Sequence, residues 1–513
     1  MDGLTSHDQD PLRSDSISKG GQSVGWHIRY TDISFIFLSP AKIMALNSGT
    51  HLLTIDKRLP PEIMSEIFTI VTMRNLDDFG FKKNTSTPSP LSLTLVCRSW
   101  RSIAQSTPAL WTSLRIYIPY RNIPQHIQDI QQWISRSGQL PLSIQVHRHP
   151  SVLLESLDPL VDELINLVKS CSHRWESLEI KLDAELLLRF CDSISGPSIL
   201  KTLILAPPRA YVKGFRKPFN TGAPLSSPIY VSLSSSTVWP LGICWDNVTH
   251  FTARRMDAGQ ALEILRLSPQ LQEFTLSGLW RANDGDLPSS PVLRTRLETL
   301  HAYLTLHSVS HQIMENITSP SLKHLNCMGH QLSASSIINF LDRSGCSLET
   351  FSLRDAAINE GDIIHLLSAM PHLETLTLES RYITNRLLNM LTAMTGVSTR
   401  LLNSQTYAPF LPKLQSLKCI GRPIFSWFWL PIVFGRHGTN EPGASDGASE
   451  SGISESGTFD RRPLRSFTLV QDIDSDSDDL DADIMVEVKR LREEGCVIDI
   501  VFGHVQSAKL III

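Results

Sequence analysis

The sequence predicts an α/β protein in which a helical hairpin is followed by a long, curved solenoid with a parallel inner sheet. Three observations predict this class. A pair of amphipathic helical segments lies between residues 56 and 115. Eight copies of the phrase L-x-x-L-x-L, some with Phe, Ala or Cys in place of Leu, follow it. Apolar helical segments recur between these copies with nearly the same period, so we expect one strand and one helix in each unit.

The composition excludes the extreme classes of protein. The chain has 513 residues, of which 42% are hydrophobic, so it has enough apolar material for a large core. Its 47 Lys and Arg against 51 Asp and Glu give a net charge of −4, which argues against a nucleic-acid-binding protein. The eight cysteines include no C-x-x-C pair, so we expect free thiols in a reducing compartment, cytoplasmic and/or nuclear.

Residues 1–55 precede the first predicted element and are rich in Ser, Gly and Asp, so we expect a disordered N-terminal extension. The first apolar run, Ile33 to Leu46, contains Ser, Pro and Lys. It is shorter than the roughly 20 apolar residues that a membrane helix needs, and no secretory signal is recognisable. The sequence therefore predicts no membrane partner.

The hairpin occupies residues 56–115. Leu59 to Glu62 suits a helix start, because proline fits the first helical position and an acid in the first turn favours the positive end of the helix dipole. Apolar residues at helical spacing continue this helix to about Met73; they are Ile63, Ile67, Ile70 and Val71. A loop from Arg74 to Pro90 leads to a second helix over residues 91–104. Pro108 ends that helix, and a strand begins near Leu114.

The residues of this hairpin resemble an F-box. The resemblance spans residues 58–115 and rests on three segments, Leu59–Phe68, Leu95–Ala104 and Pro108–Trp111. It implies docking on the Skp-type adaptor, and through it on the cullin, of an SCF-type cullin-RING ubiquitin ligase. The residues that we assign to adaptor binding are Leu59, Pro60, Ile63, Val96, Cys97, Trp100, Leu110 and Trp111. Some of these must hold the core of the hairpin instead. The loop 74–90 is longer than the family's usual connection, which leaves its course open.

The repeated phrase predicts the rest of the architecture. Its copies start at Leu200, Leu271, Leu297, Leu322, Leu348, Leu373, Leu414 and Leu464. The central starts are 26, 25, 26 and 25 residues apart, a period that resembles leucine-rich repeats. Helical segments recur in the gaps at 337–341, 363–367 and 387–391, and looser strands are expected at 114–118, 142–146 and 178–182. The step from 200 to 248 leaves room for one degenerate unit. The predicted fold is thus an F-box hairpin followed by a leucine-rich-repeat solenoid over residues 116–434.

Strand alternation predicts a polar surface on this solenoid. The fourth and sixth residues of each phrase point into the core, so the third and fifth face the concave side. These residues are Glu273, Thr275, Thr299, His301, His324, Asn326, Thr350, Ser352, Thr375, Thr377, Ser416 and Lys418. Each alone reads most simply as part of a solvated strand face. Taken together they are the expected substrate-binding surface, since solenoids bind partners on their concave side.

Three segments interrupt the pattern. Residues 206–247 carry four basic residues among aromatics, and we interpret them as an irregular insertion rather than a site for single-stranded nucleic acid. Residues 435–463 form a low-complexity insertion expected to be disordered. Residues 464–513 are expected to hold a last repeat and a cap, with an acidic loop at 472–483. Phosphorylation of Ser475 and Ser477 in that loop is a secondary hypothesis.

The sequence contains no recognisable catalytic or metal-binding motif. There is no G-x-S-x-G, H-E-x-x-H, Walker-type or G-x-G-x-x-G pattern in a suitable context. His307 and His311 lie one helical turn apart and His301 precedes them, yet no ligand set converges there. Cys97, Cys327 and Cys419 are expected to be packing residues. We therefore expect a protein without cofactor, metal or catalytic activity.

The function that follows from the resemblance is that of a substrate receptor. The F-box would dock on the adaptor, the repeats would hold a protein substrate, and proximity would accelerate ubiquitin transfer without a catalytic side chain in this chain. Two alternatives stay open. One is a non-ligase leucine-rich-repeat scaffold whose hairpin is only a cap, and the other is an enzyme whose active-site residues are scattered over the concave face.

Overall fold

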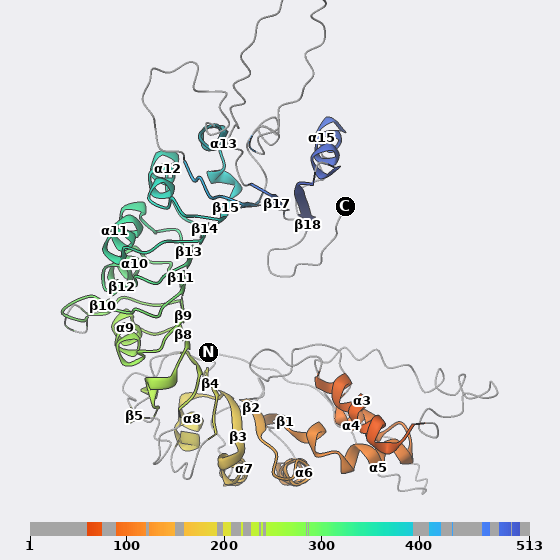
Figure 1. The fold of residues 1–513 in the computed structure, drawn as a ribbon. Helices are drawn as coiled ribbons and strands as arrows, with labels where there is room; N and C mark the ends of the chain where they lie inside the picture. Colours follow the sequence, from red (N-terminus) through yellow and green to blue (C-terminus); the bar gives the residue numbers. More distant parts are fainter. Residues whose placement is uncertain are drawn as a thin grey trace, which may run out of the picture.

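The computed structural model describes most of the chain between residues 59 and 502 (Figure 1). The described ranges are 59–73, 89–118, 123–148, 159–191, 199–206, 217–218, 227–234, 238–239, 243–283, 285, 287–392, 410–421, 433, 464–471, 482–493 and 495–502. The predicted extension 1–55 and the insertion 435–463 lie outside these ranges. So do three basic residues of the segment 206–247 and all of the acidic segment except its last two residues, with which a helix begins.

The amino-terminal hairpin begins with helix α3 (Pro61–Met73). The predicted second helix is two helices, α4 (Pro90–Thr94) and α5 (Arg98–Ser106), followed by the short helix η1 (Pro108–Trp111). The prediction of one continuous helix is wrong because Cys97 adopts an extended backbone conformation with φ −155° and ψ 173°. Its thiol accepts a hydrogen bond from the backbone N–H of Trp100, so Cys97 caps a new helix.

A single sheet of 14 parallel strands forms the rest of the described fold, and its strands follow one another in chain order. Its strands are β1 (Ser113–Ile118), β2 (Leu142–Arg148), β3 (Trp175–Lys181), β4 (Thr202–Leu205), β6 (Tyr230–Ser234), β8 (His250–Arg254), β9 (Glu273–Ser277), β11 (Thr299–Tyr303), β13 (His324–Met328), β14 (Thr350–Arg354), β15 (Thr375–Glu379), β16 (Ser416–Ile420), β17 (Ser466–Gln471) and β18 (Val497–Phe502). Two short strand pairs lie outside it: β5 (Lys217–Pro218) with β7 (Val238–Trp239), and β10 (Val292–Leu293) with β12 (Ile317–Thr318).

Helices connect most of these strands and lie along one side of the sheet (Figure 1). They are α6 (Ile123–Arg136), α7 (Pro159–Ser170), α8 (Ala184–Cys191), α9 (Ala258–Leu267), α10 (His307–Glu315), α11 (Ala334–Ser344), α12 (Glu360–Ser368), α13 (Asn385–Thr392) and α15 (Ala482–Glu493). The short helices η2 (Ser172–Arg174), η3 (Trp245–Asn247) and η5 (Ser380–Tyr382) complete the connections. Most neighbouring strands are thus joined by a helical crossover, the kind of connection that parallel strands need. In the part of the chain that the structure describes, no helix has the length and apolar character to span a bilayer.

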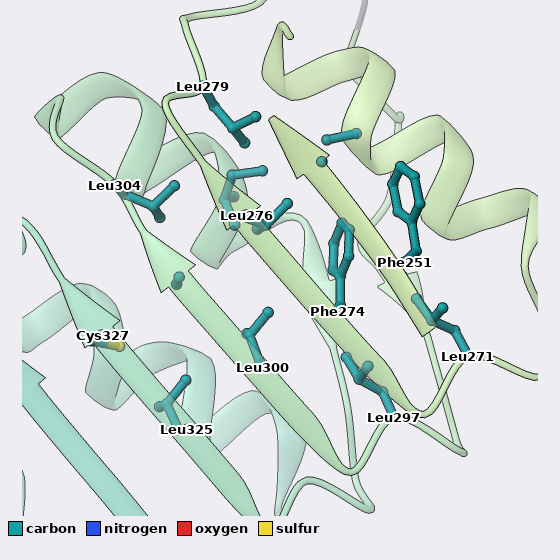
Figure 2. Close-up of a cluster of buried hydrophobic side chains, with 14 of the residues drawn as sticks. Phe251, Leu271, Phe274, Leu276, Leu279, Leu297, Leu300, Leu304, Leu325 and Cys327 are labelled. Carbon is teal, nitrogen blue, oxygen red and sulfur yellow. The ribbon is translucent and has the colours of Figure 1, made fainter. Parts of the chain in front are cut away.

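Six strands in the second half of the sheet alternate strictly between buried and half-buried residues. In β9, β11, β13, β14, β15 and β16 the second and fourth residues are buried and the others are not. Figure 2 shows the buried rows of neighbouring strands, with Phe251, Phe274, Leu300 and Leu325 packed between sheet and helices. This alternation confirms the predicted assignment of the fourth and sixth phrase residues to the core.

The strands predicted from the repeated phrase are present in one mixed α/β unit with a large parallel sheet. The looser predicted strands correspond to β1, β2 and β3, and the degenerate unit between residues 200 and 248 is β6. At the far end β18 pairs with β17, and the role of residues 464–513 as a cap stays a prediction. The structure confirms the predicted strands and helices. That these units belong to the leucine-rich-repeat family stays a prediction.

One glycine allows three successive units to approach closely. Gly329 follows β13 with φ +149°, a conformation that L-residues rarely adopt. A Cβ atom built on it would lie 1.7 Å from the backbone carbonyl oxygen of Leu304. Its N–H donates a hydrogen bond of 3.2 Å to the carbonyl of Arg354. Gly329 therefore permits a backbone contact between three successive units that no side chain would allow.

Candidate interaction surfaces

The hairpin has its own small hydrophobic core. Seven buried residues form it: Met64, Phe68, Leu93, Ile103, Ala104, Leu110 and Trp111. The indole N–H of Trp111 donates a 2.8 Å hydrogen bond to the carbonyl of Ala104, and Trp111 also makes an edge-to-face contact with Trp133 of α6 at 4.8 Å between ring centres. The hairpin is therefore packed against the first helix that follows β1.

The hairpin also exposes apolar side chains. On α3 the isoleucines predicted to form the amphipathic stripe are exposed, because Met64 and Phe68 supply the buried face instead. The break between α4 and α5 exposes Leu95 by 76% and Val96 by 59%. Several large apolar side chains exposed to solvent on one small module mark a protein contact site.

The structure divides the eight residues assigned to adaptor binding from sequence. Pro60, Ile63 and Val96 are exposed and available to a partner. Leu59 and Trp100 are half-buried against the hairpin core. Leu110 and Trp111 are buried in the core itself, so they hold the hairpin together rather than face a partner.

Cys97, the eighth residue, is half-buried and caps α5, which corrects its interpretation as a packing residue. Leu95, Ile67 and Ile70 are also exposed, although they were not among the residues predicted to bind the adaptor. A helix with apolar residues on two faces could have signalled this, since one face suffices for the core.

The predicted substrate-binding residues form two parallel rows on the sheet. Strand pairing places the third phrase residues in one row, namely Glu273, Thr299, His324, Thr350, Thr375 and Ser416. The fifth residues form the second row, namely Thr275, His301, Asn326, Ser352, Thr377 and Lys418. All twelve are half-buried, so they line a polar surface, which we call the polar face. The register thus brings together every residue predicted from the phrase.

The centre of the polar face is a group of hydrogen-bonding side chains. His301 Nε2 lies 3.7 Å from Glu273 Oε1, and the His301 ring stacks on Tyr303 with an interplanar angle of 8°. The amide of Asn326 donates a 3.4 Å hydrogen bond to the Tyr303 hydroxyl. Burial lowers the pKa of His301, and this effect is larger than the rise in pKa caused by the Glu273 carboxylate. His301 is therefore neutral at pH 7.

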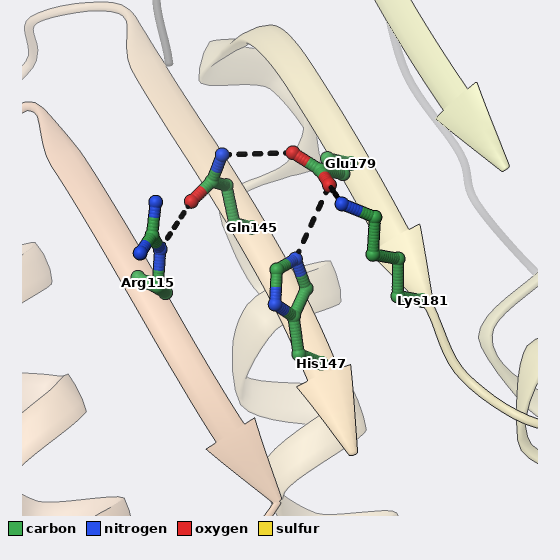
Figure 3. A network of polar contacts seen from close by, with 5 residues as sticks. All are labelled: Arg115, Gln145, His147, Glu179 and Lys181. Carbon is green, nitrogen blue, oxygen red and sulfur yellow. Dashed lines mark hydrogen bonds and ion pairs between the residues drawn. The ribbon is translucent and has the colours of Figure 1, made fainter. Parts of the chain in front are cut away.

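The same side of the sheet carries a charged network on β1, β2 and β3 that was not predicted from sequence (Figure 3). Gln145 Nε2 donates a 2.7 Å hydrogen bond to Glu179 Oε2. The side-chain oxygen Oε1 of Gln145 accepts a 2.5 Å hydrogen bond from Arg115 Nε. Glu179 Oε1 lies 3.3 Å from His147 Nε2 and forms an ion pair with Lys181. The signal for this network was the alternation of polar residues in strands that sequence had already placed.

The network holds Glu179 in its charged form. Burial by itself raises the pKa of this carboxyl group. Hydrogen bonds from His147 and Lys181, together with their charge, outweigh burial and lower the pKa to about 2. All the oxygens of Glu179 therefore have partners, and the network serves to join three strands rather than to await a ligand.

The two histidines and two cysteines that the sequence singled out elsewhere lie on α10, β13 and β16. His307 and His311 lie on α10 with ring centres 6.4 Å apart, and His311 pairs with Glu315 at 3.0 Å. No group of three or more His, Cys, Asp or Glu suited to a metal occurs within the described ranges. Cys327 and Cys419 are buried as predicted, and burial raises the pKa of each thiol to about 12.

Comparison with known families identifies the hairpin. Residues 57–117 match a family described as F-box-like, a span that contains α3, α4, α5, η1 and most of β1. No curated protein matches the chain. The chain thus carries an F-box-like domain before its large parallel sheet, in the position predicted from sequence.

Proposed function

We propose that this chain is the substrate-receptor subunit of an SCF-type cullin-RING ubiquitin ligase. The main observation in support is that the segment matching the F-box-like family also exposes several large apolar side chains. F-box domains typically bind Skp-type adaptors. Docking would bury these side chains, which are anchors of the kind that dominate protein interfaces.

The large sheet supplies the second half of the proposal. We interpret its strand–helix units as a leucine-rich-repeat solenoid whose polar face holds a protein substrate. Its twelve residues offer many hydrogen-bonding groups and few charges, which suits a protein segment. The chain itself would act by proximity, since a substrate held near the conjugating enzyme reacts at a raised effective concentration. We expect it to be non-catalytic, to need no cofactor, and to act in the cytoplasm and/or nucleus.

The docking surface can be tested with purified chain and a Skp-type adaptor. The double variant Ile63→Ala/Val96→Ala removes two exposed side chains and leaves the hairpin core intact. We expect adaptor affinity to fall at least about tenfold, because truncation of a central interface anchor commonly costs more than 1 kcal/mol. Circular dichroism should stay unchanged.

A matched control is Leu293→Ala, which removes an exposed leucine from β10, far along the chain from the hairpin. This variant should bind the adaptor like the wild type. If the double variant binds equally well, the docking surface is wrongly assigned. If the wild-type chain itself does not bind the adaptor, the alternative of a non-ligase scaffold is favoured.

A further inference from the structure

The centre of the polar face combines three hydrogen-bond acceptors on consecutive strands. Glu273 lies on β9, His301 on β11 and Asn326 on β13, and neighbouring strands of a sheet are about 4.8 Å apart. His301 and Asn326 are direct register partners. His301 therefore lies between Glu273 and Asn326 on one face of the sheet, and a group bound over His301 has both residues as neighbours.

Two of these acceptors lack a hydrogen bond in the structure. Asn326 directs its NH₂ group at the Tyr303 hydroxyl, and its Oδ1 atom is buried without a partner. Nδ1 of His301 is also buried without a partner. Because Nε2 is the nitrogen nearest the Glu273 carboxylate, it favours the proton and leaves Nδ1 as an acceptor. Buried acceptors without a donor are costly, so each calls for an explanation.

The third acceptor is a carboxylate without a permanent cation. The charged or chargeable groups nearest Glu273 are His250 Nε2 at 3.8 Å and His301 Nε2 at 3.7 Å. A histidine forms an ion pair with a carboxylate only when it is protonated, and burial opposes protonation of His301. Within the described part of the chain no Lys or Arg forms an ion pair with Glu273, and its side chain is 41% exposed.

We propose that Glu273, His301 and Asn326 form a recognition site for a basic side chain, arginine in the first place, carried by a segment of the protein substrate. A guanidinium has several donors in a rigid plane and no acceptor, so it complements a site that has acceptors and a negative charge. Both half-buried side chains can turn their orphan atoms toward the ligand, as rotamer changes are common at interfaces. An acidic or phosphorylated segment would instead place its charge beside Glu273.

This inference rests on the proposed function, because it names the substrate class of the same face. The experiment measures binding of fluorescent 12-residue peptide pools to the full chain by fluorescence anisotropy. The pools are random in neutral residues and differ only at one central position, which is Arg, Gln or Glu. We expect the Arg pool to bind at least fivefold more tightly than the Gln pool, and the Glu pool to bind most weakly.

Two variants and one control assign the effect to the site. Glu273→Gln and Asn326→Ala should each abolish most or all of the preference for Arg over Gln, since hydrogen bonds to charged groups are the strong ones. Ser352→Ala changes a residue of the same row on β14 and should preserve the preference. Unchanged circular dichroism excludes misfolding of the variants.

Equal binding of the Arg and Gln pools by the wild type, or a preference for Glu, would overturn the inference. So would a preference that survives Glu273→Gln. These outcomes are independent of adaptor docking, which is measured on the hairpin. A chain that binds the adaptor but shows no preference for Arg refutes only the basic-substrate site, whereas a chain that prefers Arg but does not bind the adaptor refutes the ligase role.

Discussion

Replacing Glu179 by Gln tests the charged network that joins the first three strands of the sheet. The side chain of Glu179 is only 6% exposed and contacts Gln145, His147 and Lys181. Gln has nearly the same shape, so the substitution removes the negative charge and leaves the packing volume in place. The loss in stability should therefore report the electrostatic part of the network.

The magnitude follows from the pKa of Glu179, which is lowered from 4.5 to about 2. A shift of that size corresponds to roughly 3 kcal/mol at about 1.4 kcal/mol per pKa unit. This is an upper limit, because Lys181 is 47% exposed and solvent screens its attraction. Because the folded-state pKa is lowered, the stabilisation is complete above pH 4.5 and is lost as the pH falls toward 2.

Hydrogen exchange followed by mass spectrometry measures this locally, on peptides that cover β2 and β3. At pH 7 the free energy of opening should be lower in Glu179→Gln than in the wild type by up to about 3 kcal/mol. The difference should shrink progressively below pH 4.5. Glu273→Gln is the matched control, since it removes a carboxylate that is 41% exposed from the same side of the sheet. A difference that is independent of pH would refute the electrostatic explanation.

Three further results are expected. In a urea titration, Gly329→Ala should lower the free energy of unfolding by more than about 3 kcal/mol, because the added Cβ would clash with backbone atoms. Gly345 also has a positive φ but has open space around the added Cβ, so Gly345→Ala should lower the free energy of unfolding by only about 1–2 kcal/mol. Trp111→Phe should lower stability by about 1–3 kcal/mol, because it leaves the Ala104 carbonyl without its donor and opens a void; calorimetry would detect this, and an unchanged melting temperature would contradict it. Binding of the Arg peptide pool should weaken only as the pH falls below 6.5, because the pKa of His301 is lowered from that value by burial and only protonated His301 competes for the neighbouring carboxylate; anisotropy that does not change with pH would argue against this arrangement.

Periodicity was sufficient to predict the sheet. The phrase L-x-x-L-x-L combines a period of 2 residues in each strand with a period of 25 to 26 residues along the chain, and both periods can be read from the amino-acid sequence. It placed β9 to β15, and the looser copies placed β1 to β3. The second helix of the hairpin was mispredicted because Leu95 and Val96 fit a helical pattern, whereas they are the exposed residues of a capped break.

The candidate sites were predictable only in part. Alternation in the strands correctly assigned the residues of the polar face, including Glu273, His301 and Asn326, to one side of the sheet. It could not show that two of their acceptor atoms lack a partner, because this depends on rotamers and neighbours. Likewise, Trp111 and Val96 are both apolar residues of the same family pattern, and only packing separates the core residue from the exposed one.

The sequence by itself determined the order of the units, the parallel sheet and the presence of an F-box-like hairpin, because these depend on local patterns of apolar residues repeated along the chain. Tertiary structure alone decided which hairpin residues remain exposed and how Glu179 acquires its partners on β2 and β3. The physical reason is that burial and hydrogen bonding between residues 30 or more positions apart depend on register and side-chain geometry, which no local pattern contains.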